Sequence, residues 1–344
     1  MTIDTEITMG VLQDLFTSPE LCPLQIDVGT ESLMLARFSR QAYRDCISLG
    51  MNGAQRYASA IYQMRVDDVL LAASGAPPIL KPTHYILHAA YCCSTLLARY
   101  LELMPSCFVL KEPQLLAQLA LGYKPSLPRW NELFDLGVRL LSRTYEPEEV
   151  AIIKMHVPCN VLGERLLQHN PRSTITFLAT PLRHFVLAVL KSNVRRRRVR
   201  YWLRHMAQYA QPGIDLVNIN PADLTDAEVA VCFWILNRAF CEQLTAGPYR
   251  SRVLVLDGEC VAESPREVLP NVTNLLGLSI GQDQLRGLVE HPSFQRHAKQ
   301  PSRPYDAASR RREIGVLENL WGVEVGASIA WATSRGMLSG SSMN

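Results

Sequence analysis

The chain has 344 residues, of which 48% are hydrophobic and 19% are charged, and its formal net charge is +3. This length and apolar content are enough to bury the core of one large domain, or of one domain with a smaller appendage. The small net charge gives no ground for expecting nucleic acid as a partner. The longest apolar stretches, such as 229–236, fall well short of the roughly 20 residues that a membrane-spanning helix needs.

The cysteines and the N-terminal residues indicate the compartment. Nine cysteines are scattered along the chain, and Cys92 and Cys93 are the only close pair. An odd number without a CxxC motif favours reduced thiols over a disulfide framework, and no Cys/His cluster has the spacing of metal ligands. The first eight residues lack the basic and apolar regions of a signal peptide. We therefore expect a cytoplasmic protein without a membrane span or a bound metal.

The first 78 residues have the pattern of a separate N-terminal layer. Short strands are predicted at 24–28 and 33–37, and helices at 41–49 and 53–73. The Pro- and Gly-containing segment 74–78 then breaks the pattern. We predict a small α+β extension over 1–78 and a main domain over 79–338.

After this break, short apolar runs alternate with longer helical patterns. The predicted strands are 85–89, 108–110, 151–155, 175–178 and 253–256, and the predicted helices are 95–103, 130–144, 182–191, 226–244 and 267–276. The strands are apolar almost throughout, as expected for strands that are buried on both faces. The alternation predicts a three-layer α/β/α fold with a central, mostly parallel sheet.

The segment 84–99 has the pattern of a strand, a turn of small residues and a helix. Ser94 and Thr95 lie where the helix is predicted to begin. Unpaired N–H groups and the positive end of the helix dipole make such a position an anion site. An ordinary strand-to-helix turn capped by a hydroxyl is the alternative. The segment has no GxxxxGK[ST] motif, so it is not a Walker A loop.

Charged side chains follow the next two predicted strands. Glu112 comes directly after the strand at 108–110, and Lys154 interrupts the strand at 151–155. Ligands in parallel sheets lie beyond the carboxyl ends of the strands, where a carboxylate could deprotonate an acceptor hydroxyl. A lysine in an apolar strand is rarely buried without a partner. Taken alone, Glu112 also fits a surface turn before a proline, and His156 fits a structural histidine.

Two segments are strongly basic. Seven of the sixteen residues in 191–206 are Lys or Arg, and Tyr201 and Trp202 lie among them. This run fits a solvated helix face or an anion-binding surface. The second segment, 295–299 with Arg303 and 310–312, is predicted to be a basic, Pro-rich loop, which alone favours a solvated surface.

Taken in order, the segments within 84–312 resemble the sulfotransferase family that uses 3′-phosphoadenosine 5′-phosphosulfate. The loop Tyr91-Cys92-Cys93-Ser94-Thr95, the turn Lys111-Glu112-Pro113 and the segment Thr180-Pro181-Leu182-Arg183 carry the resemblance, together with 253–259 and the closing 264–278 segment. The resemblance implies a divergent, bacterial-type member with a P-loop-like fold. It also implies transfer of a sulfuryl group to a hydroxyl or amine of a small molecule or peptide.

The resemblance also implies roles for individual residues. Glu112 would be the base, with His88 or His156 in reserve, and Lys154 or Lys111 would stabilise charge on the transferred group. The residues implied in binding the co-substrate are Tyr91, Cys92, Cys93, Ser94, Thr95, Lys111, Arg183, Lys191, Ser192, Arg296 and His297. No metal is implied.

Four positions depart from the family pattern, and they leave alternatives open. The basic residue and the glycine of the family loop are Tyr91 and Cys93, the arginine before the proline is Ala179, and the serine that binds the 3′-phosphate aligns with Leu187. One alternative is a nucleotide-dependent phosphoryl transferase with Mg²⁺, for which Asp257 is the candidate ligand. The other is a non-catalytic relative that binds a nucleotide or a partner protein. The acceptor and the oligomeric state do not follow from the sequence.

Overall fold

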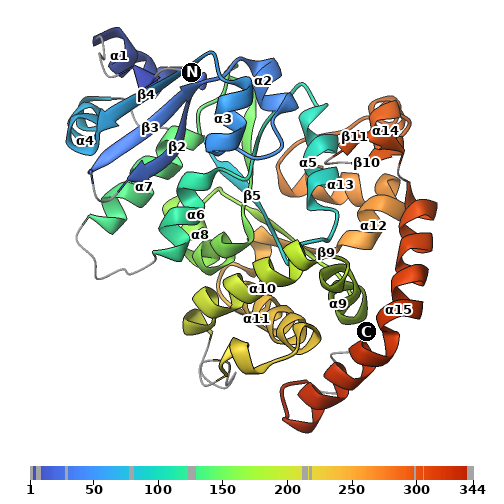
Figure 1. The fold of residues 1–344 in the computed structure, drawn as a ribbon. Helices are drawn as coiled ribbons and strands as arrows, with labels where there is room; N and C mark the ends of the chain where they lie inside the picture. The colour runs from blue at the N-terminus through green and yellow to red at the C-terminus, as the bar shows by residue number, and fades with distance from the viewer. Residues whose placement is uncertain are drawn as a thin grey trace. The chain divides into compact units, whose positions relative to one another are not determined.

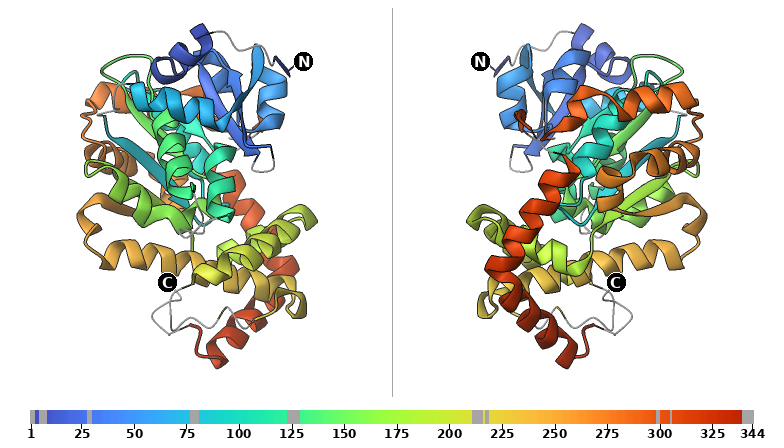
Figure 2. Two further views of the ribbon diagram at one scale, coloured as in Figure 1. Left: turned by 90° about the vertical axis from the view of Figure 1, so that its left-hand side faces the viewer. Right: turned by 90° about the vertical axis from the view of Figure 1, so that its right-hand side faces the viewer.

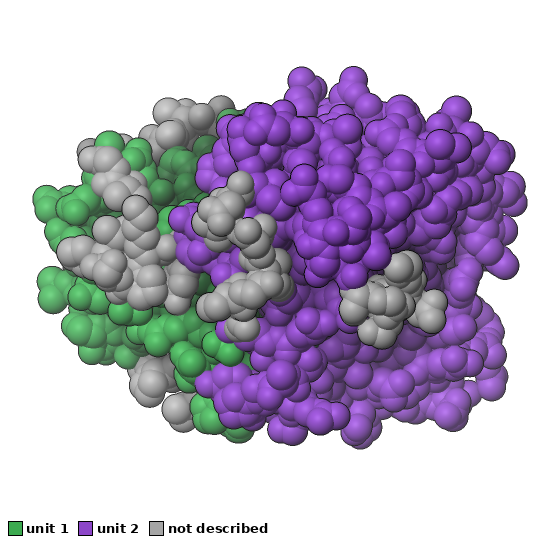
Figure 3. Space-filling view, turned by 90° about the horizontal axis from the view of Figure 1, so that it is seen from below, with its two compact units in different colours: residues 1–86, 98–175 green, residues 87–97, 176–344 purple. Residues whose placement is uncertain are grey.

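The computed structural model describes residues 3–4, 9–27, 30–76, 81–122, 129–210, 216, 219–297, 300–304 and 306–338. The chain divides into two compact units, which Figure 3 shows in different colours. The first unit comprises Met1–Ile86 and Ala98–Ile175, and the second comprises Leu87–Leu97 and Thr176–Asn344. The boundary predicted at residue 78 stays a prediction.

The N-terminal layer of the first unit is a four-stranded sheet in the order β1-β4-β3-β2. Its strands are β1 (Ile3–Asp4), β2 (Leu21–Asp27), β3 (Ser32–Arg37) and β4 (Ala60–Arg65), and its helices are α1 (Met9–Thr17), α2 (Arg40–Asp45), α3 (Met51–Tyr57) and α4 (Val66–Gly75). The strands predicted at 24–28 and 33–37 are confirmed. The single helix predicted over 53–73 is wrong, because β4 interrupts it. All six residues of β4 pair with β3, and this pairing overrides the local helical pattern.

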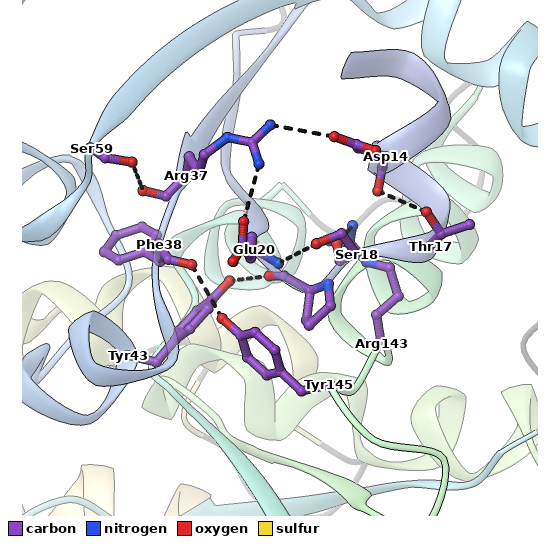
Figure 4. A network of polar contacts seen from close by, with 11 residues as sticks. Asp14, Thr17, Ser18, Glu20, Arg37, Phe38, Tyr43, Ser59, Arg143 and Tyr145 are labelled. Atoms are coloured by element: carbon purple, nitrogen blue, oxygen red, sulfur yellow. Dashed lines mark hydrogen bonds and ion pairs between the residues drawn. The ribbon is translucent and has the colours of Figure 1, made fainter. Parts of the chain in front are cut away.

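A buried arginine joins this layer to the segment that follows α7 (Trp130–Leu141). The guanidinium of Arg143 is buried and donates hydrogen bonds to the backbone carbonyls of Leu15, Ser18, Leu21 and Leu140. Two tyrosine hydroxyls nearby also donate to carbonyls, Tyr43 to Pro19 at 2.6 Å and Tyr145 to Phe38 at 3.2 Å (Figure 4). These side chains therefore bond backbone carbonyls at the ends of α1, β2 and α7 and in the loops beside them.

The central sheet has five strands in the order β6-β7-β5-β8-β9 (Figure 1). The strands are β5 (Thr83–His88), β6 (Cys107–Lys111), β7 (Val150–Lys154), β8 (Ile175–Ala179) and β9 (Val253–Asp257). β7 pairs in parallel with both β5 and β6. Every residue of β5 and β6 is buried, as the apolar runs predict. The five predicted strands and the α/β class are confirmed.

Helices cover both faces of the strands in the first unit. Thr83 of β5 donates a hydrogen bond of 2.6 Å to Ser142, at the end of α7. Lys111 of β6 reaches Glu102, at the end of α5, on the other face. Thr83 pairs with Ala151 of β7, and Lys111 pairs with Lys154, three residues further along the same strand. Side chains an odd number of residues apart on a strand point to opposite faces, so Thr83 and Lys111 lie on opposite faces of the sheet. The helices that follow the first strands are α5 (Ser94–Glu102), α6 (Gln114–Leu121), α7 and α8 (Gly163–His169).

The second unit is mostly helical. Its helices are α9 (Leu182–Leu190), α10 (Asn193–Met206), α11 (Asp226–Ala246), α12 (Gly258–Glu263), α13 (Pro265–Leu275), α14 (Gln282–Val289) and α15 (Ala307–Ser334). The helices predicted at 182–191, 226–244 and 267–276 are confirmed. Thr225 and Glu228 form a reciprocal capping box at the start of α11, which satisfies two N–H groups of its first turn.

The longest helix, α15, was not predicted. It has 28 residues and packs against α9 and α11 (Figure 2). The predicted loop is therefore wrong for 310–312, which lie in the first turns of this helix. The carboxylate of Asp306 caps the helix by accepting the N–H of Ser309 at 2.7 Å. Upstream, β10 (Arg296–His297) and β11 (Gln300–Pro304) form an antiparallel pair.

The nine cysteines, all within the described residues, form no disulfide, and seven of them are buried. None of the helices in the described residues is long and apolar enough to cross a membrane.

Candidate functional site

The first group of polar residues lies at the carboxyl ends of β6 and β7 in the first unit. Lys111 and Lys154 end these strands and pair in register. The backbone N–H of Glu112 donates to the carbonyl of Lys154 at 2.6 Å, and Nζ of Lys154 donates to Oε1 of Glu112. Both side chains are buried, Lys154 with 1% exposure. The structure thus confirms the carboxyl-end position of both charges and joins them in one ion pair.

The backbone of Glu112 is strained. Its φ is +52°, a left-handed conformation that residues other than glycine rarely adopt. Such conformations cost free energy and persist where the surrounding contacts hold them, often at functional sites. Nδ1 of His156 lies 3.7 Å from Oε2 of the same carboxylate. Glu112, Lys154 and His156 are therefore together in this structure.

Lys111 is held by a different carboxylate. Its ammonium donates to Oε1 of Glu102 at 2.7 Å and to the carbonyl of Arg44 at 2.8 Å. Burial lowers the pKa of Lys111 and raises the pKa of Glu102, because both charged forms lose hydration. The predicted role of Lys111 in binding the co-substrate stays a prediction.

In the second unit, the loop between β5 and α5 has an unusual backbone. Ala90, Tyr91 and Cys93 have φ values of +73°, +54° and +60°. Left-handed residues in such a turn point successive N–H groups toward one side, which makes an anion-binding concavity. Helix α5 begins immediately afterwards at Ser94, and its first turn adds further N–H groups and the positive end of its dipole. The loop adopts left-handed conformations even though it contains no glycine.

His88 helps to shape this loop from its first residues. Nδ1 of His88 accepts the backbone N–H of Ala90 at 3.1 Å. In the neutral ring, this bond places the proton on Nε2. His88 is buried, as are Ser94 and Thr95 on the other side of the loop. Its reserve role as a base stays a prediction.

A glycine allows another turn to approach the loop closely. Gly258 begins α12, and a Cβ placed on it would overlap the carbonyl oxygen of Cys92. No residue with a side chain fits there unless the loop moves. The sequence shows Gly258 after the last predicted strand but gives no sign of this contact.

A cluster centred on Glu259 contacts the same loop. The carboxylate of Glu259 accepts two hydrogen bonds from Arg310, at 2.5 and 2.6 Å, and one from the Thr180 hydroxyl at 3.1 Å. Arg310 also donates to the carbonyl of Tyr91 at 3.3 Å. Burial alone would raise the pKa of Glu259, but the hydrogen bonds from Arg310 and His184 outweigh it and lower the pKa to about 2. Glu259 therefore stays ionised.

A second guanidinium lies on the loop. The guanidinium carbon of Arg195 lies 4.4 Å from the ring centroid of Tyr91, in a cation–π contact. In the family that the sequence resembles, a basic residue stands at the position of Tyr91. Here Arg195 contacts the Tyr91 ring and Arg310 contacts its carbonyl. The contact of Arg310 was not predicted, because no local pattern connects this residue with a loop more than 200 residues earlier.

The other residues implied in binding the co-substrate make contacts within the second unit. Arg183 donates from Nε to both carboxylate oxygens of Glu318, at 3.1 and 3.0 Å, and Lys191 pairs with Glu313. The hydroxyl of Ser192 caps α10. Arg296 is exposed on β10, and the side chain of His297 lies outside the described residues. Their roles in binding the co-substrate stay predictions.

The structure also shows what Asp257 does. Its carboxylate caps α12 by accepting the N–H of Glu259 at 2.9 Å. Within the described residues, no three His, Cys, Asp or Glu side chains form a group that could hold a metal ion.

No protein-family model matches the chain, and no curated protein sequence matches it. Several solved structures similar to it are sulfotransferases. The sulfotransferase domain of the curacin biosynthetic pathway is 12% identical, with a TM-score of 0.41, over 71% of this chain and 98% of that one. A sulfotransferase from Alicyclobacillus acidocaldarius is 17% identical, with a TM-score of 0.40, over 70% and 96% of the two chains. A mouse sulfotransferase complexed with PAP is 11% identical, with a TM-score of 0.33, over 60% and 63%. Similarities this distant do not transfer a function.

Proposed function

We propose that this protein is a sulfotransferase that moves a sulfuryl group from 3′-phosphoadenosine 5′-phosphosulfate to a hydroxyl or amine of a small molecule or peptide. The observation that carries the proposal is the loop 89–93. It combines three left-handed residues, the start of α5 and two guanidiniums on Tyr91. These are the features of a site for a dianionic or more highly charged group.

In this proposal, the loop holds the phosphosulfate end of the co-substrate. The N–H groups at the start of α5 bind its oxygens, and the hydroxyls of Ser94 and Thr95 add donors. Arg195 supplies positive charge beside position 91, where the family pattern has a basic residue, and Arg310, which is paired with Glu259, donates to the carbonyl of Tyr91. Arginine suits this task, because its guanidinium stays charged and its planar fork matches anionic oxygens.

The ion pair of Glu112 and Lys154 supplies the acid–base chemistry. The acceptor oxygen or nitrogen forms a bond to sulfur, and the bond between sulfur and the bridging phosphate oxygen breaks. Glu112 takes the proton that the acceptor loses, and 3′-phosphoadenosine 5′-phosphate leaves. Lys154 holds the carboxylate of Glu112 through an ion pair and a hydrogen bond. Its ammonium also stabilises negative charge on the transferred group.

The first half of the proposal is tested by binding of 3′-phosphoadenosine 5′-phosphate. The rise in the melting temperature of the protein when this ligand is added measures the binding. A ligand at 100 times its dissociation constant stabilises the folded state by about 2.7 kcal/mol, which shifts the melting temperature by several degrees. Arg195→Leu should lose most of this shift. Arg197→Leu is the matched control, because Arg197 is exposed on the same helix. No shift at millimolar ligand would contradict the proposal.

Transfer of labelled sulfate from 3′-phosphoadenosine 5′-phosphosulfate to a panel of phenols, alcohols and amines tests the second half. We expect product with at least one acceptor class, and none with Glu112→Gln. ATP with Mg²⁺ is the comparison ligand. A shift in melting temperature with Mg²⁺–ATP but none with 3′-phosphoadenosine 5′-phosphate would favour a phosphoryl transferase instead. Binding without transfer to any acceptor would favour a non-catalytic relative.

A further inference from the structure

The first unit contains a cavity of about 690 Å³ that the proposed chemistry does not use. It opens between α4, α7, α8 and the first half of β5. The residues on which its chemistry depends are Lys81, Tyr85, Asp135, Leu136, Arg139 and Arg165. Cavities of this volume are typical of sites for small organic ligands.

This cavity is separate from the ion pair of Glu112 and Lys154. Tyr85 pairs in register with Ile153, whereas Ile86 pairs with Lys154. Neighbouring residues of a strand point to opposite faces of the sheet, so Tyr85 and Lys154 lie on opposite faces. The hydrogen bond from Thr83, two residues before Tyr85, to Ser142 places the Tyr85 face on the side of α7.

Two buried donors in the lining have no protein partner. The hydroxyl of Tyr85, whose side chain is 1% exposed, has no hydrogen-bond partner among the described residues. The same holds for the buried Nε of Arg165 within the part of the chain that the structure describes. A buried polar group without a partner costs free energy, and native proteins usually satisfy such a group with a bonded molecule. Nε of Arg165 can only donate, and the Tyr85 hydroxyl can donate, so an acceptor would satisfy both groups.

The charges around the cavity favour an anionic acceptor. Arg139 donates to the carbonyls of Ala73 and Ala76, at 2.7 and 2.6 Å, which orient its guanidinium. Lys81 donates to the hydroxyl of Thr144 at 3.3 Å and to the backbone carbonyl of Glu146 at 3.2 Å. The lining contains three cations, Lys81, Arg139 and Arg165, against two carboxylates, Glu132 and Asp135, and Asp135 lies 3.7 Å from Nη2 of Arg165.

The remaining wall is apolar, with Leu70, Ala73, Leu136 and Val138. A ligand with a charged head and a hydrocarbon body would match both parts of the lining. We propose that this cavity binds a small amphipathic carboxylate, with its carboxylate on the Tyr85 hydroxyl and the Arg165 guanidinium and its apolar body against Leu136. This site is independent of the proposed sulfuryl transfer.

Thermal melting and titration calorimetry of the full-length protein with octanoate, octanol and octylamine test the proposal. We expect octanoate to raise the melting temperature at millimolar concentration, and octanol and octylamine to have little effect. Tyr85→Phe should weaken octanoate binding at least fivefold. Without ligand, this variant should have a melting temperature no lower than that of the unmodified protein. That combination identifies a hydroxyl whose role is to bind the ligand, because a purely structural hydroxyl would lower the melting temperature when removed.

The matched control is Tyr43→Phe, which removes a buried hydroxyl outside the cavity that already donates to Pro19. It should melt lower and keep its affinity for octanoate. A second variant, Leu136→Trp, fills the cavity and should also lose octanoate binding. Equal octanoate binding by the unmodified protein and Tyr85→Phe would overturn the proposal, as would equal effects of octanoate and octanol. Addition of 3′-phosphoadenosine 5′-phosphate in parallel separates the two proposals, because octanoate should bind whether or not the nucleotide does.

Discussion

Lys154 and Glu112 are joined twice, once through their side chains and once through their backbones. Nζ of Lys154 donates to the carboxylate of Glu112, and the N–H of Glu112 donates to the carbonyl of Lys154. The second bond extends the ladder between β6 and β7 by one residue, and the left-handed φ of Glu112 accompanies it. The position of this carboxylate is therefore set by the sheet itself rather than by a loop.

Removing the carboxylate charge should affect catalysis more than binding. We expect Glu112→Gln to lower the rate of sulfuryl transfer by about 10²–10⁴-fold, the usual contribution of a positioned general base. Binding of 3′-phosphoadenosine 5′-phosphate, measured by thermal shift, should be unchanged. Glu148→Gln removes an exposed carboxylate of the same unit and is the control. Unchanged transfer by Glu112→Gln would refute the assignment of the base.

The partner of this carboxylate should matter for stability. Lys154→Met leaves a buried carboxylate without its cation, and breaking such a pair from one side typically costs about 3–5 kcal/mol. Urea unfolding measures the loss. The double variant Glu112→Leu with Lys154→Met removes both charges, so it should recover most of the stability. If the single and double variants were equally unstable, the loss would come from packing rather than from the unpaired charge.

The contact between Gly258 and the loop predicts an effect of one added methyl group. In Gly258→Ala the new Cβ overlaps the carbonyl of Cys92, so either the loop or α12 must shift. We expect destabilisation of about 1–3 kcal/mol, the usual cost of overpacking, and weaker nucleotide binding. Gly287→Ala is the control, because nothing lies within 4 Å of the Cβ added there, and it should be neutral or stabilising by up to about 1 kcal/mol. Equal stability of the two variants would show that the loop tolerates the shift.

The sequence was sufficient to predict the central sheet, because its strands are short, apolar and separated by clear helical patterns. Pairing of β4 with β3 was not predictable, since it depends on partners 23 to 33 residues away rather than on local periodicity. Helix α15 was missed because it contains three glycines, 315, 322 and 326, and buries only four of its residues. Its amphipathic pattern is correspondingly weak.

The candidate site was predictable where chemistry and strand position coincide. Glu112 and Lys154 stand out because charged residues follow or interrupt apolar strands. The contacts of Arg195 and Arg310 with Tyr91 were not predictable, because each depends on how helices pack rather than on spacing. A sequence pattern can show that a loop lacks a basic residue, but it cannot show which distant arginine contacts that loop.

The buried guanidinium of Arg143 should be essential for the N-terminal layer. Arg143→Leu removes the donors of four carbonyl bonds, and each buried acceptor left unsatisfied costs about 1–3 kcal/mol. We expect a loss of at least about 3 kcal/mol in urea unfolding, with Arg172→Leu, an exposed arginine, as the control. A loss below about 1 kcal/mol would show that water replaces the guanidinium.

The pH dependence of stability should reveal the buried histidine of β5. His84 bonds through Nδ1 to the Thr174 hydroxyl at 2.8 Å, and burial lowers its pKa from 6.5 to about 4. Between these two values the unfolded chain binds a proton that the folded protein does not, so stability is fully present above pH 6.5 and is lost as the pH falls toward 4. The shift corresponds to a loss of about 3 kcal/mol over this window.

His84→Gln keeps a polar group beside Thr174 but cannot take up the proton. We therefore expect the unfolding free energy of His84→Gln to decline less than that of the unmodified protein between pH 7 and pH 4. The difference between the two declines should be about 3 kcal/mol over this window. Urea unfolding at closely spaced pH values measures the difference. His291→Gln, at an exposed position, controls for the loss of a histidine as such. Parallel curves for His84→Gln and the unmodified protein would mean that water reaches the imidazole of His84, and that burial does not suppress its protonation.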